Sequence, residues 1–237
     1  MPADPRRVDL NADLGEEVTD DAGLLAVVTS ANVACGFHAG TTEIMRRVCA
    51  ESARRGVVVG AQVSYRDREG FGRVARDVPF AVLRDEVAEQ VGVLDDLARS
   101  EGTEVRYLKP HGALYHRVTV DDEQAAAVLA GSGALPVLGF PGARVLELAA
   151  AAGRATYHEG FPDRRYVDGR LDGRLVDRGE PDALFGDEAE ISAQALGLAS
   201  TVASLCLHGD SPGAVAHATA VRRALERASY AVRPFLD

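Results

Sequence analysis

The sequence is poor in the residues that build disulfide scaffolds and stacking surfaces. It has no tryptophan, only 5% aromatic residues and three cysteines in 237 residues. Cys35, Cys49 and Cys206 are widely spaced, odd in number and free of any CxxC pair. We therefore expect neither a disulfide framework nor a structural zinc site, and each cysteine is predicted to be a small buried residue.

Long apolar runs are also missing. No stretch of about 18 apolar residues occurs, which predicts that no helix spans a membrane, and the N-terminal MPADPRRVDL shows no apolar signal region. The net charge of −10 disfavours phosphate backbones and anionic lipid as partners. We expect a cytoplasmic protein that binds neither nucleic acid nor membrane.

What is present is a globular composition, with 46% apolar and 26% charged residues. Strand-like runs, short and rich in Val, Leu and Ala, are predicted at 7–13, 30–37, 57–63, 105–111, 135–140, 155–161 and 203–208. Helices are predicted at 41–55, 80–100, 121–130, 143–152, 187–200 and 214–228.

This alternation is typical of parallel βαβ units with a sheet buried on both faces. We expect a single α/β domain over 1–237, closed as a seven-stranded barrel or open as a doubly wound sheet. The absence of GxGxxG and GxxxxGK[ST] after any strand disfavours an open nucleotide-binding sheet. One irregular stretch, 162–186, carries a repeated DGRL and is expected to cover a site or form a small hairpin.

The first strand carries polar residues on one face. Asp9, Asn11 and Asp13 alternate along VDLNADLGE, so their side chains are expected to point the same way, into the barrel. Three inward polar side chains are costly unless they bind ligands or form a hydrogen-bond network. The alternative is a solvated strand end.

Other polar residues gather where later strands end, the place at which parallel barrels carry their sites. The candidates are Asn32, His38, Lys109, His111, Tyr115, Asp163, Arg164, His208 and Asp210. Lys109 could neutralise an anionic group, and His111, on the same face, could act as base or ligand.

Several of these residues have a simpler interpretation. His38 could be a turn histidine, and Asp210 could cap the following helix. The neighbouring Arg164 and Arg165 suit bidentate capture of a carboxylate or phosphate. Residue types alone leave open a metal-assisted hydrolase with Asp and His ligands and a metal-free acid/base site.

The segments VDLNADLGE, TSANVACGFHAG, GFGR, KPHGALYH, FPDRRY and LHGDSPGA resemble the LamB/YcsF family in order and spacing, from Val8 to about Ala228. The resemblance implies a seven-stranded β/α barrel related to the polysaccharide-deacetylase fold. It also implies the ATP-dependent opening of 5-oxo-L-proline to L-glutamate, with ATP and magnesium as cofactors and two other 5-oxoprolinase subunits as partners. A protein-bound divalent metal is possible on this basis but is not predicted.

Mapped onto this sequence, the resemblance implies roles for individual residues. Asp13, His38 or His111 would activate water, and Lys109 or Arg164 would hold the substrate carboxylate or the phosphorylated oxygen. Substrate contacts are expected from the remaining candidates, Asp9, Asn11, Asn32, Gln62, Tyr115, Asp163, His208 and Asp210.

The third strand departs from the family pattern. Gln62 stands where the family commonly has a histidine, and glutamine can donate a hydrogen bond but cannot act as a general base and is a poor transition-metal ligand. The segment before the seventh strand also looks shorter than usual. Gln62 weakens a three-ligand metal site and, with the missing nucleotide loop, leaves open a non-catalytic interaction subunit. The implied fold relation and the Asp/His cluster leave open a metal-dependent amide hydrolase or sugar deacetylase.

Overall fold

The computed structural model describes residues 6–18, 20–171, 174–211 and 213–236. Its sheet is parallel throughout and follows the order β2-β3-β4-β5-β6-β7-β1, and β1 also pairs with β2. The strands are β1 (Arg6–Leu14), β2 (Ser30–Ala34), β3 (Val58–Val63), β4 (Val105–Pro110), β5 (Val137–Gly139), β6 (Thr156–Gly160) and β7 (Ser204–Leu207). Pairing of β1 on both sides closes the sheet, so the barrel is confirmed and the open sheet is excluded.

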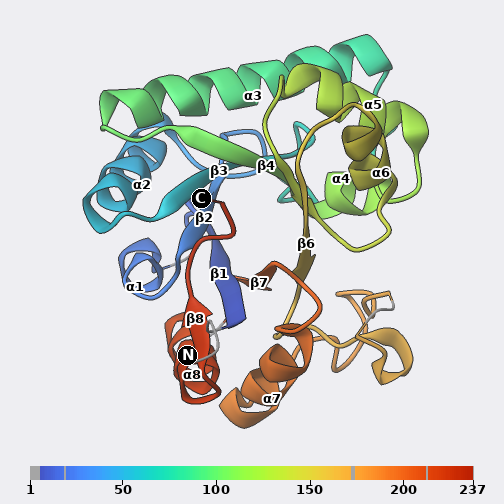
Figure 1. The fold of residues 1–237 in the computed structure, drawn as a ribbon. Helices are drawn as coiled ribbons and strands as arrows, with labels where there is room; N and C mark the ends of the chain where they lie inside the picture. The colour runs from blue at the N-terminus through green and yellow to red at the C-terminus, as the bar shows by residue number, and fades with distance from the viewer. Residues whose placement is uncertain (1–5, 19, 172–173, 212, 237) are drawn as a thin grey trace.

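Helices surround this barrel (Figure 1). They are α1 (Asp21–Leu25), α2 (Thr42–Arg55), α3 (Phe80–Ser100), α4 (Gly112–Arg117), α5 (Asp122–Gly131), α6 (Arg144–Ala151), α7 (Glu188–Leu198) and α8 (Ala214–Arg227), with a short 3₁₀ turn, η1 (Val167–Gly169). All six predicted helices are confirmed to within about two residues at each end. Helix starts follow the capping rules, since Thr41, Asp121 and Asp187 each accept a hydrogen bond from a backbone N–H of the first turn.

Several predicted boundaries were wrong. β2 ends at Ala34 and not at residue 37, because Gly36 adopts a φ of +92° and its N–H donates to the Ala39 carbonyl in a turn. β5 has three residues where six were expected. Three short elements were not predicted: the helices α1 and α4 and the strand β8 (Tyr230–Val232), which pairs with the start of β1. A segment of three to six residues is too short to show a clear periodicity of apolar residues.

The apolar core lies between the barrel and its helices. Val8, Leu10 and Leu14 are fully buried in this core, whereas Asp9 and Asp13 alternate with them and bond to residues inside the barrel. Each fully buried Val or Leu side chain contributes about 1.5–3 kcal/mol of transfer free energy. The expected inward face of the first strand is thus confirmed, and the helix-facing layer leaves the barrel interior free for polar residues.

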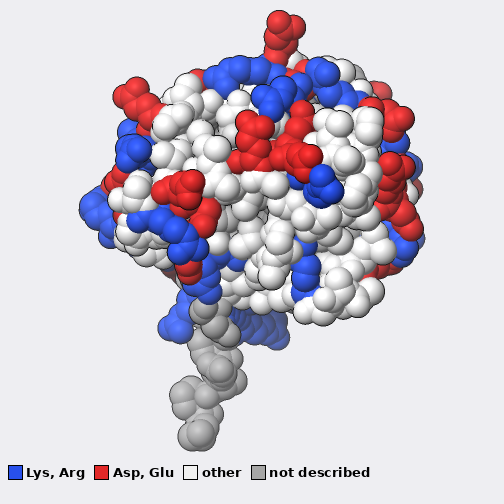
Figure 2. All heavy atoms as spheres, turned by 90° about the horizontal axis from the view of Figure 1, so that it is seen from above, with Lys and Arg blue, Asp and Glu red and all other residues white. Residues whose placement is uncertain are grey.

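Charges of both signs are mixed over the outside. On the face shown in Figure 2, basic side chains lie next to acidic ones, and ion pairs such as Arg54–Glu51 and Arg144–Asp122 link them. In the described part of the chain, no helix has the length and apolarity required to cross a membrane.

Candidate functional site

The inward face of β1 begins with a carboxylate surrounded by hydroxyl groups. Asp9 accepts hydrogen bonds from Thr29 at 2.6 Å, from Ser30 at 2.7 Å and from Ser204. Asp9 is fully buried, and burial raises its pKa to about 6. The three hydrogen bonds, and to a smaller extent the charge of Arg7, lower this pKa but do not outweigh burial. This end of the barrel, which we call the floor, is held together by neutral donors.

Amides form the next layer. Asn32 donates from Nδ2 to Asn11 at 2.6 Å and to Asp13 at 2.9 Å, and its Oδ1 accepts from the Tyr107 hydroxyl at 2.6 Å. The Tyr107 ring lies over Gly60, where an added Cβ would come within 2.2 Å of it. A glycine is therefore required in β3 for the ring to reach Asn32.

A buried lysine dominates the layer above, at the C-terminal ends of the strands. The Lys109 ammonium on β4 lies 3.0 Å from Asp13, 3.3 Å from Glu159 and 2.9 Å from the Cys206 sulfur. Burial alone would lower the pKa of Lys109, but Asp13, Cys206 and Glu159 hold it well above its usual range. The lysine is therefore a permanent cation.

The same contacts set the charge of the two carboxylates differently. Burial raises the pKa of Asp13, but the Lys109 ammonium outweighs it and holds that pKa below the usual range. Burial raises the pKa of Glu159, which Lys109 only partly offsets. Asp13 is thus ionised, and Glu159 holds its proton more readily than an exposed glutamate.

Beside the lysine lies a second cluster formed by Glu16, His38 and His111. The Glu16 carboxylate is 3.6 Å from His38 Nε2 and 3.5 Å from His111 Nδ1, and the two rings stack with centroids 3.9 Å apart. Gln62 Nε2 lies 3.1 Å from both Glu16 Oε1 and His111 Nδ1. Burial raises the pKa of Glu16, and burial together with His38 lowers the pKa of His111 well below its usual value.

The third histidine does not join that cluster. His208 bonds instead to Asp163, through Nδ1 at 3.0 Å and through its backbone N–H at 2.9 Å. Burial raises the pKa of Asp163, but His208 outweighs it and holds the pKa below the usual value. Asp210 pairs with Arg73 at 2.6 Å and with Arg178 at 2.8 Å, and the α8 N-cap is Gly213, so the capping alternative for Asp210 is wrong.

Some of these groups border a cleft of about 920 Å³ at the mouth of the barrel. Its polar lining comprises Asp13, Glu16, Arg73, Lys109, His111, Tyr115, His116, Thr119, Arg164, Arg174, Asp177, Arg178, His208 and Asp210. Among the predicted residues, Asp9, Asn11, Asn32, His38, Gln62 and Asp163 do not line it in the described structure; they lie beneath or behind the lining residues.

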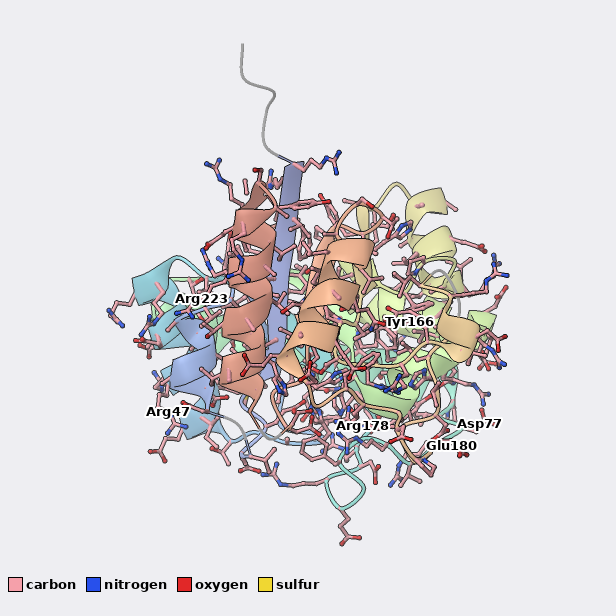
Figure 3. The ribbon with its side chains drawn as sticks, turned by 90° about the horizontal axis from the view of Figure 1, so that it is seen from below. Arg47, Asp77, Tyr166, Arg178, Glu180 and Arg223 are labelled. Carbon is pink, nitrogen blue, oxygen red and sulfur yellow. The ribbon has the colours of Figure 1, made fainter. Side chains whose placement is uncertain are left out.

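The stretch between β6 and α7 forms one wall of this cleft. Antiparallel bridges join Arg164 to Leu184 and Tyr166 to Leu175, as in the expected small hairpin, and the stretch lines the side of the cleft. Two residues of the DGRL repeat, 172 and 173, lie outside the described residues. Gln194 of α7 donates to the carbonyl oxygens of Phe161, Pro162 and Arg164, which anchors the wall. In Figure 3, Tyr166 and Arg178 of this wall lie on the side opposite Arg47 and Arg223.

Arg164 is the unusual cation of the wall. Its side chain is buried, its Nη2 donates to the Val176 carbonyl at 2.7 Å and its Nε has no hydrogen-bond partner. No carboxylate of the described residues forms an ion pair with it, and burial lowers its pKa. A buried guanidinium that lines a cleft without a counter-ion is suited to bind an anion.

Some of these functional residues were missed at the sequence level. Glu16 was noted only as following the first strand, although it lies in the quoted VDLNADLGE motif. Glu159, Cys206 and Tyr107 sit within strands, and period-two alternation with Lys109 could have placed Tyr107 on the inner face. Arg178 had no signal, because only the folded wall brings it to Asp210.

The LamB/YcsF family matches residues 8–237 of this chain. The chain belongs to the LamB/YcsF family. It is 51% identical to a protein of Streptomyces griseus subsp. griseus that is named as a 5-oxoprolinase subunit, over 251 positions that cover 96% of this chain and 99% of that relative. The alignment is longer than the chain itself, so the relative carries residues that this family member lacks.

Solved structures agree on the architecture. A lactam utilization protein from Thermus thermophilus is 33% identical and superposes with a TM-score of 0.87, covering 96% of this chain and 99% of that chain. A family 4 carbohydrate esterase from Streptomyces lividans is 8% identical, with a TM-score of 0.53, over 95% of this chain and 91% of that chain. The esterase shares the fold alone, which agrees with the expected relation to polysaccharide deacetylases.

Proposed function

We propose that this chain is the ring-opening subunit of a cytoplasmic, ATP-dependent 5-oxoprolinase, which converts 5-oxo-L-proline to L-glutamate together with two partner subunits. Relatives named as 5-oxoprolinase subunits or as a lactam utilization protein, each aligned over nearly their whole length, support this reaction class. The observation that carries the proposal is the Lys109 cluster, a fixed cation at the base of a cleft large enough for a small substrate.

The chemistry requires activation of a poor electrophile. A lactam carbonyl is resonance-stabilised, and transfer of the γ-phosphoryl group of ATP to its oxygen makes the carbon open to attack. Water then adds, the C–N bond breaks with proton transfer to nitrogen, and an acyl phosphate results. A second water releases phosphate and leaves glutamate, so one ATP and two waters are consumed.

Lys109 is placed to stabilise the oxygen on which charge develops. Its ammonium is held on the inside by Asp13, Glu159 and Cys206 and lines the cleft on the other side. A preorganised cation in a site shielded from water stabilises such charge far more than it would in bulk water. This assignment favours the phosphorylated oxygen over the substrate carboxylate as the partner of Lys109.

The base that activates water is better assigned to Glu16 or His111 than to Asp13. A base works best when its pKa lies near the working pH, and Lys109 holds the pKa of Asp13 too low for that. Burial raises the pKa of Glu16, which lines the cleft, so Glu16 meets this criterion. Burial and His38 lower the pKa of His111 well below its usual value, so His111 is neutral and can accept a proton but is the weaker base of the two. Asp13 is then the group that positions Lys109.

Arg164 is the expected clamp for the substrate carboxylate. It supplies a buried guanidinium that forms no ion pair with a carboxylate of the described residues, and His208, held by Asp163, lines the same cleft. The lactam would lie between this wall and Lys109. Asp9, Asn11, Asn32 and Gln62 support the lining residues from beneath, whereas Tyr115 and Asp210 remain predicted substrate contacts.

Phosphorylation is assigned to a partner subunit. No phosphate-binding glycine loop follows any strand of this sequence, so we place ATP and its magnesium counter-ion on the partners and the ring opening here. This division explains why the chain would be active only in the assembled enzyme.

The test is reconstitution. The chain, mixed with the two partner subunits, ATP and 5-oxo-L-proline, is expected to release glutamate and phosphate, and omission of any component should stop glutamate release. Glu16→Gln should lower kcat by about 10²-fold or more as expected for loss of a general base, and Arg164→Lys should mainly raise KM.

Three results would count against parts of this proposal. No glutamate from well-folded, assembled subunits would reject the reaction. Full activity in the Lys109→Met assembly would favour the non-catalytic interaction subunit instead. Release of an amine from simple amides, or of acetate from acetylated sugars, without ATP would favour the hydrolase or deacetylase alternative.

A further inference from the structure

The Glu16, His38 and His111 cluster has the spacing of a metal site. Metal–ligand bonds of about 2.0–2.2 Å place the ligand atoms of a tetrahedral site about 3.4–3.6 Å apart. Glu16 Oε1 lies 3.6 Å from His38 Nε2 and 3.5 Å from His111 Nδ1, and the three ligand atoms all lie within 4.8 Å of one another. The His38 and His111 rings are stacked, 12° from parallel, so one ion could contact all three groups once the His38 ring turns out of the stack.

His111 is oriented as a ligand. Its Nε2 lies 3.0 Å from the Phe71 carbonyl oxygen, which can only accept a hydrogen bond, so the ring proton resides on Nε2. Nδ1 then presents its lone pair to Glu16 and the cluster centre. A backbone carbonyl that fixes the tautomer in this way is the usual outer support of a metal-binding histidine.

His38 makes no hydrogen bond within the described residues, although its Nε2 lies 3.6 Å from Glu16. It is 1% exposed, and neither ring nitrogen has a hydrogen-bond partner among the described residues. Both nitrogens of a buried imidazole are expected to be satisfied, and the lack of a partner costs about 1–3 kcal/mol. An ion between His38 Nε2 and Glu16 would supply the missing partner.

Gln62 can complete the ligand set. Its Oε1 is buried without a partner, while its Nε2 points at Glu16 and His111. The oxygen and nitrogen of an amide are nearly indistinguishable by shape, and the amide can turn over. After that turn, Oε1 faces the cluster centre as a weak oxygen ligand, and the unpaired oxygen gains a partner.

No fixed cation already neutralises this carboxylate. The ion pairs of Glu16 in the described structure are with His38 and His111 alone, and Lys109 is engaged by Asp13 and Glu159. Glu16 and His111 also line the cleft, so an ion can enter from solvent.

We propose that Glu16, His38 and His111, with the Gln62 amide oxygen, bind one divalent transition-metal ion at the mouth of the barrel. Two imidazoles with carboxylate and amide oxygens suit Zn²⁺, Co²⁺ or Mn²⁺ and disfavour Ca²⁺ and Mg²⁺, which prefer oxygen alone. The site is separate from the lysine cluster but shares Glu16 and His111 with the base assignment above, so ion binding and base action by these two side chains are alternative states of one cluster. Detection of the ion does not depend on the proposed reaction.

Titration with CoCl₂ tests the proposal. After chelator treatment and dialysis, the intact chain is expected to bind one Co²⁺ per molecule, with visible absorption bands of a low-symmetry site. ZnCl₂ should displace Co²⁺ and raise Tm. Ca²⁺ and Mg²⁺ should do neither. These readouts need no lactam, ATP or partner protein, so failure here is distinguishable from failure of the proposed function.

Variants locate the site. His38→Ala and the isosteric Glu16→Gln should each weaken Co²⁺ binding by at least about 100-fold, given that loss of an outer support alone costs 10–100-fold. Gln62→His, which replaces a weak oxygen ligand by an imidazole, should tighten it by about tenfold. His158→Ala, an exposed histidine on β6, is the matched control and should bind as the unchanged protein does.

Two outcomes would overturn the proposal. One is the absence of stoichiometric Co²⁺ binding by the folded chain. The other is equal binding by Glu16→Gln, Gln62→His and the His158→Ala control, which would place the ion elsewhere. Glu16→Gln is expected to weaken Co²⁺ binding and Gln62→His to tighten it. These two variants therefore test the site even if His38→Ala fails to fold.

Discussion

The floor and the mouth of this barrel shift the pKa of the same residue type, on the same strand face, in opposite directions. Asp9 at the floor is surrounded by hydroxyl donors, and burial raises its pKa to about 6. Asp13, four residues further along β1, lies 3.0 Å from the Lys109 ammonium, which holds its pKa below the usual range despite equal burial.

The difference shows that burial does not decide the charge of an inward carboxylate. Hydroxyl donors stabilise an ionised carboxylate less than the loss of water destabilises it, whereas a full positive charge within 3 Å reverses the balance. The floor is therefore suited to hold the barrel together, and the mouth is suited to present fixed charge to a ligand.

The largest expected effect comes from removal of the cation at the mouth. Lys109→Met leaves Asp13 and Glu159 buried without a counter-ion, and we expect a loss of about 3–5 kcal/mol in the free energy of unfolding, together with loss of glutamate release by the assembled enzyme. Arg106→Met removes a charge from an intermediate-burial position on the same strand and should cost less than about 1 kcal/mol. Urea denaturation of both variants at pH 7.5 measures the contrast; equal losses would contradict it.

The second test concerns the floor. Asp9 has a folded-state pKa of about 6 against 3.8 for the free side chain, so the folded protein binds this proton more tightly than the unfolded chain does. The resulting stability is present below about pH 4 and is lost as pH rises through 6, by up to about 3 kcal/mol.

Comparison with Asp9→Asn isolates this effect. The variant lacks the titrating group, so the free energy of unfolding of the unchanged protein should fall relative to the variant between pH 4 and pH 7.5. Denaturant unfolding at several pH values measures this difference in the free energy of unfolding. Parallel pH profiles for the two proteins would show that Asp9 is not the titrating group.

The third test concerns the crowding of the mouth. Gly72 has a φ of +69°, and an added Cβ would lie 2.4 Å from Ser64 Oγ and 2.9 Å from both His111 Cδ2 and His38 Cβ. Gly72→Ala should cost about 2–4 kcal/mol, the sum of backbone strain and overpacking, and should displace both histidines.

Gly56 supplies a close control for that change. Its φ is +70°, but an added Cβ would meet nothing within 4 Å. Gly56→Ala should therefore show the backbone strain alone, about 1 kcal/mol. Thermal and urea unfolding of the pair separate the two contributions; if both variants lose the same stability, the contacts at Gly72 are not tight.

The smallest effect on stability is expected at the rim. Arg178→Ala removes one of two arginines that pair with Asp210, and a partly exposed ion pair contributes about 0–1 kcal/mol. The same change should raise KM of the assembled enzyme more than it lowers kcat, because the wall loses positive charge without loss of Lys109. Steady-state kinetics gives the two values, and an unchanged KM would place the substrate away from this wall.

Most of the architecture could be predicted from the sequence because it depends on local patterns. Strand-length apolar runs, helix caps such as Thr41 and Asp187, and the polar alternation of Asp9 and Asp13 all follow from residues close in the chain. The missed elements, such as β8, are too short for periodicity to show. The expectation of one parallel β/α barrel therefore holds, while individual strand ends moved by one to three residues.

The candidate site was predictable as a set of strand ends and not as a set of contacts. The sequence placed His38, His111 and His208 at one end of the barrel, but offered no reason why two of them stack beside Glu16 while the third pairs with Asp163. Nothing in the motifs indicated that Glu159 and Cys206 would reach Lys109, because those contacts join strands far apart in the chain.

By itself, the sequence determined the residue types, their periodicity and hence which side chains face into a closed barrel. The tertiary structure alone decided which charges meet: it gave Asp13 a lysine and Asp9 three hydroxyl donors, and among the described residues it placed no carboxylate in an ion pair with Arg164. The physical reason is that the charge state of a buried group depends on distances of a few ångströms between strands, and chain order does not set those distances.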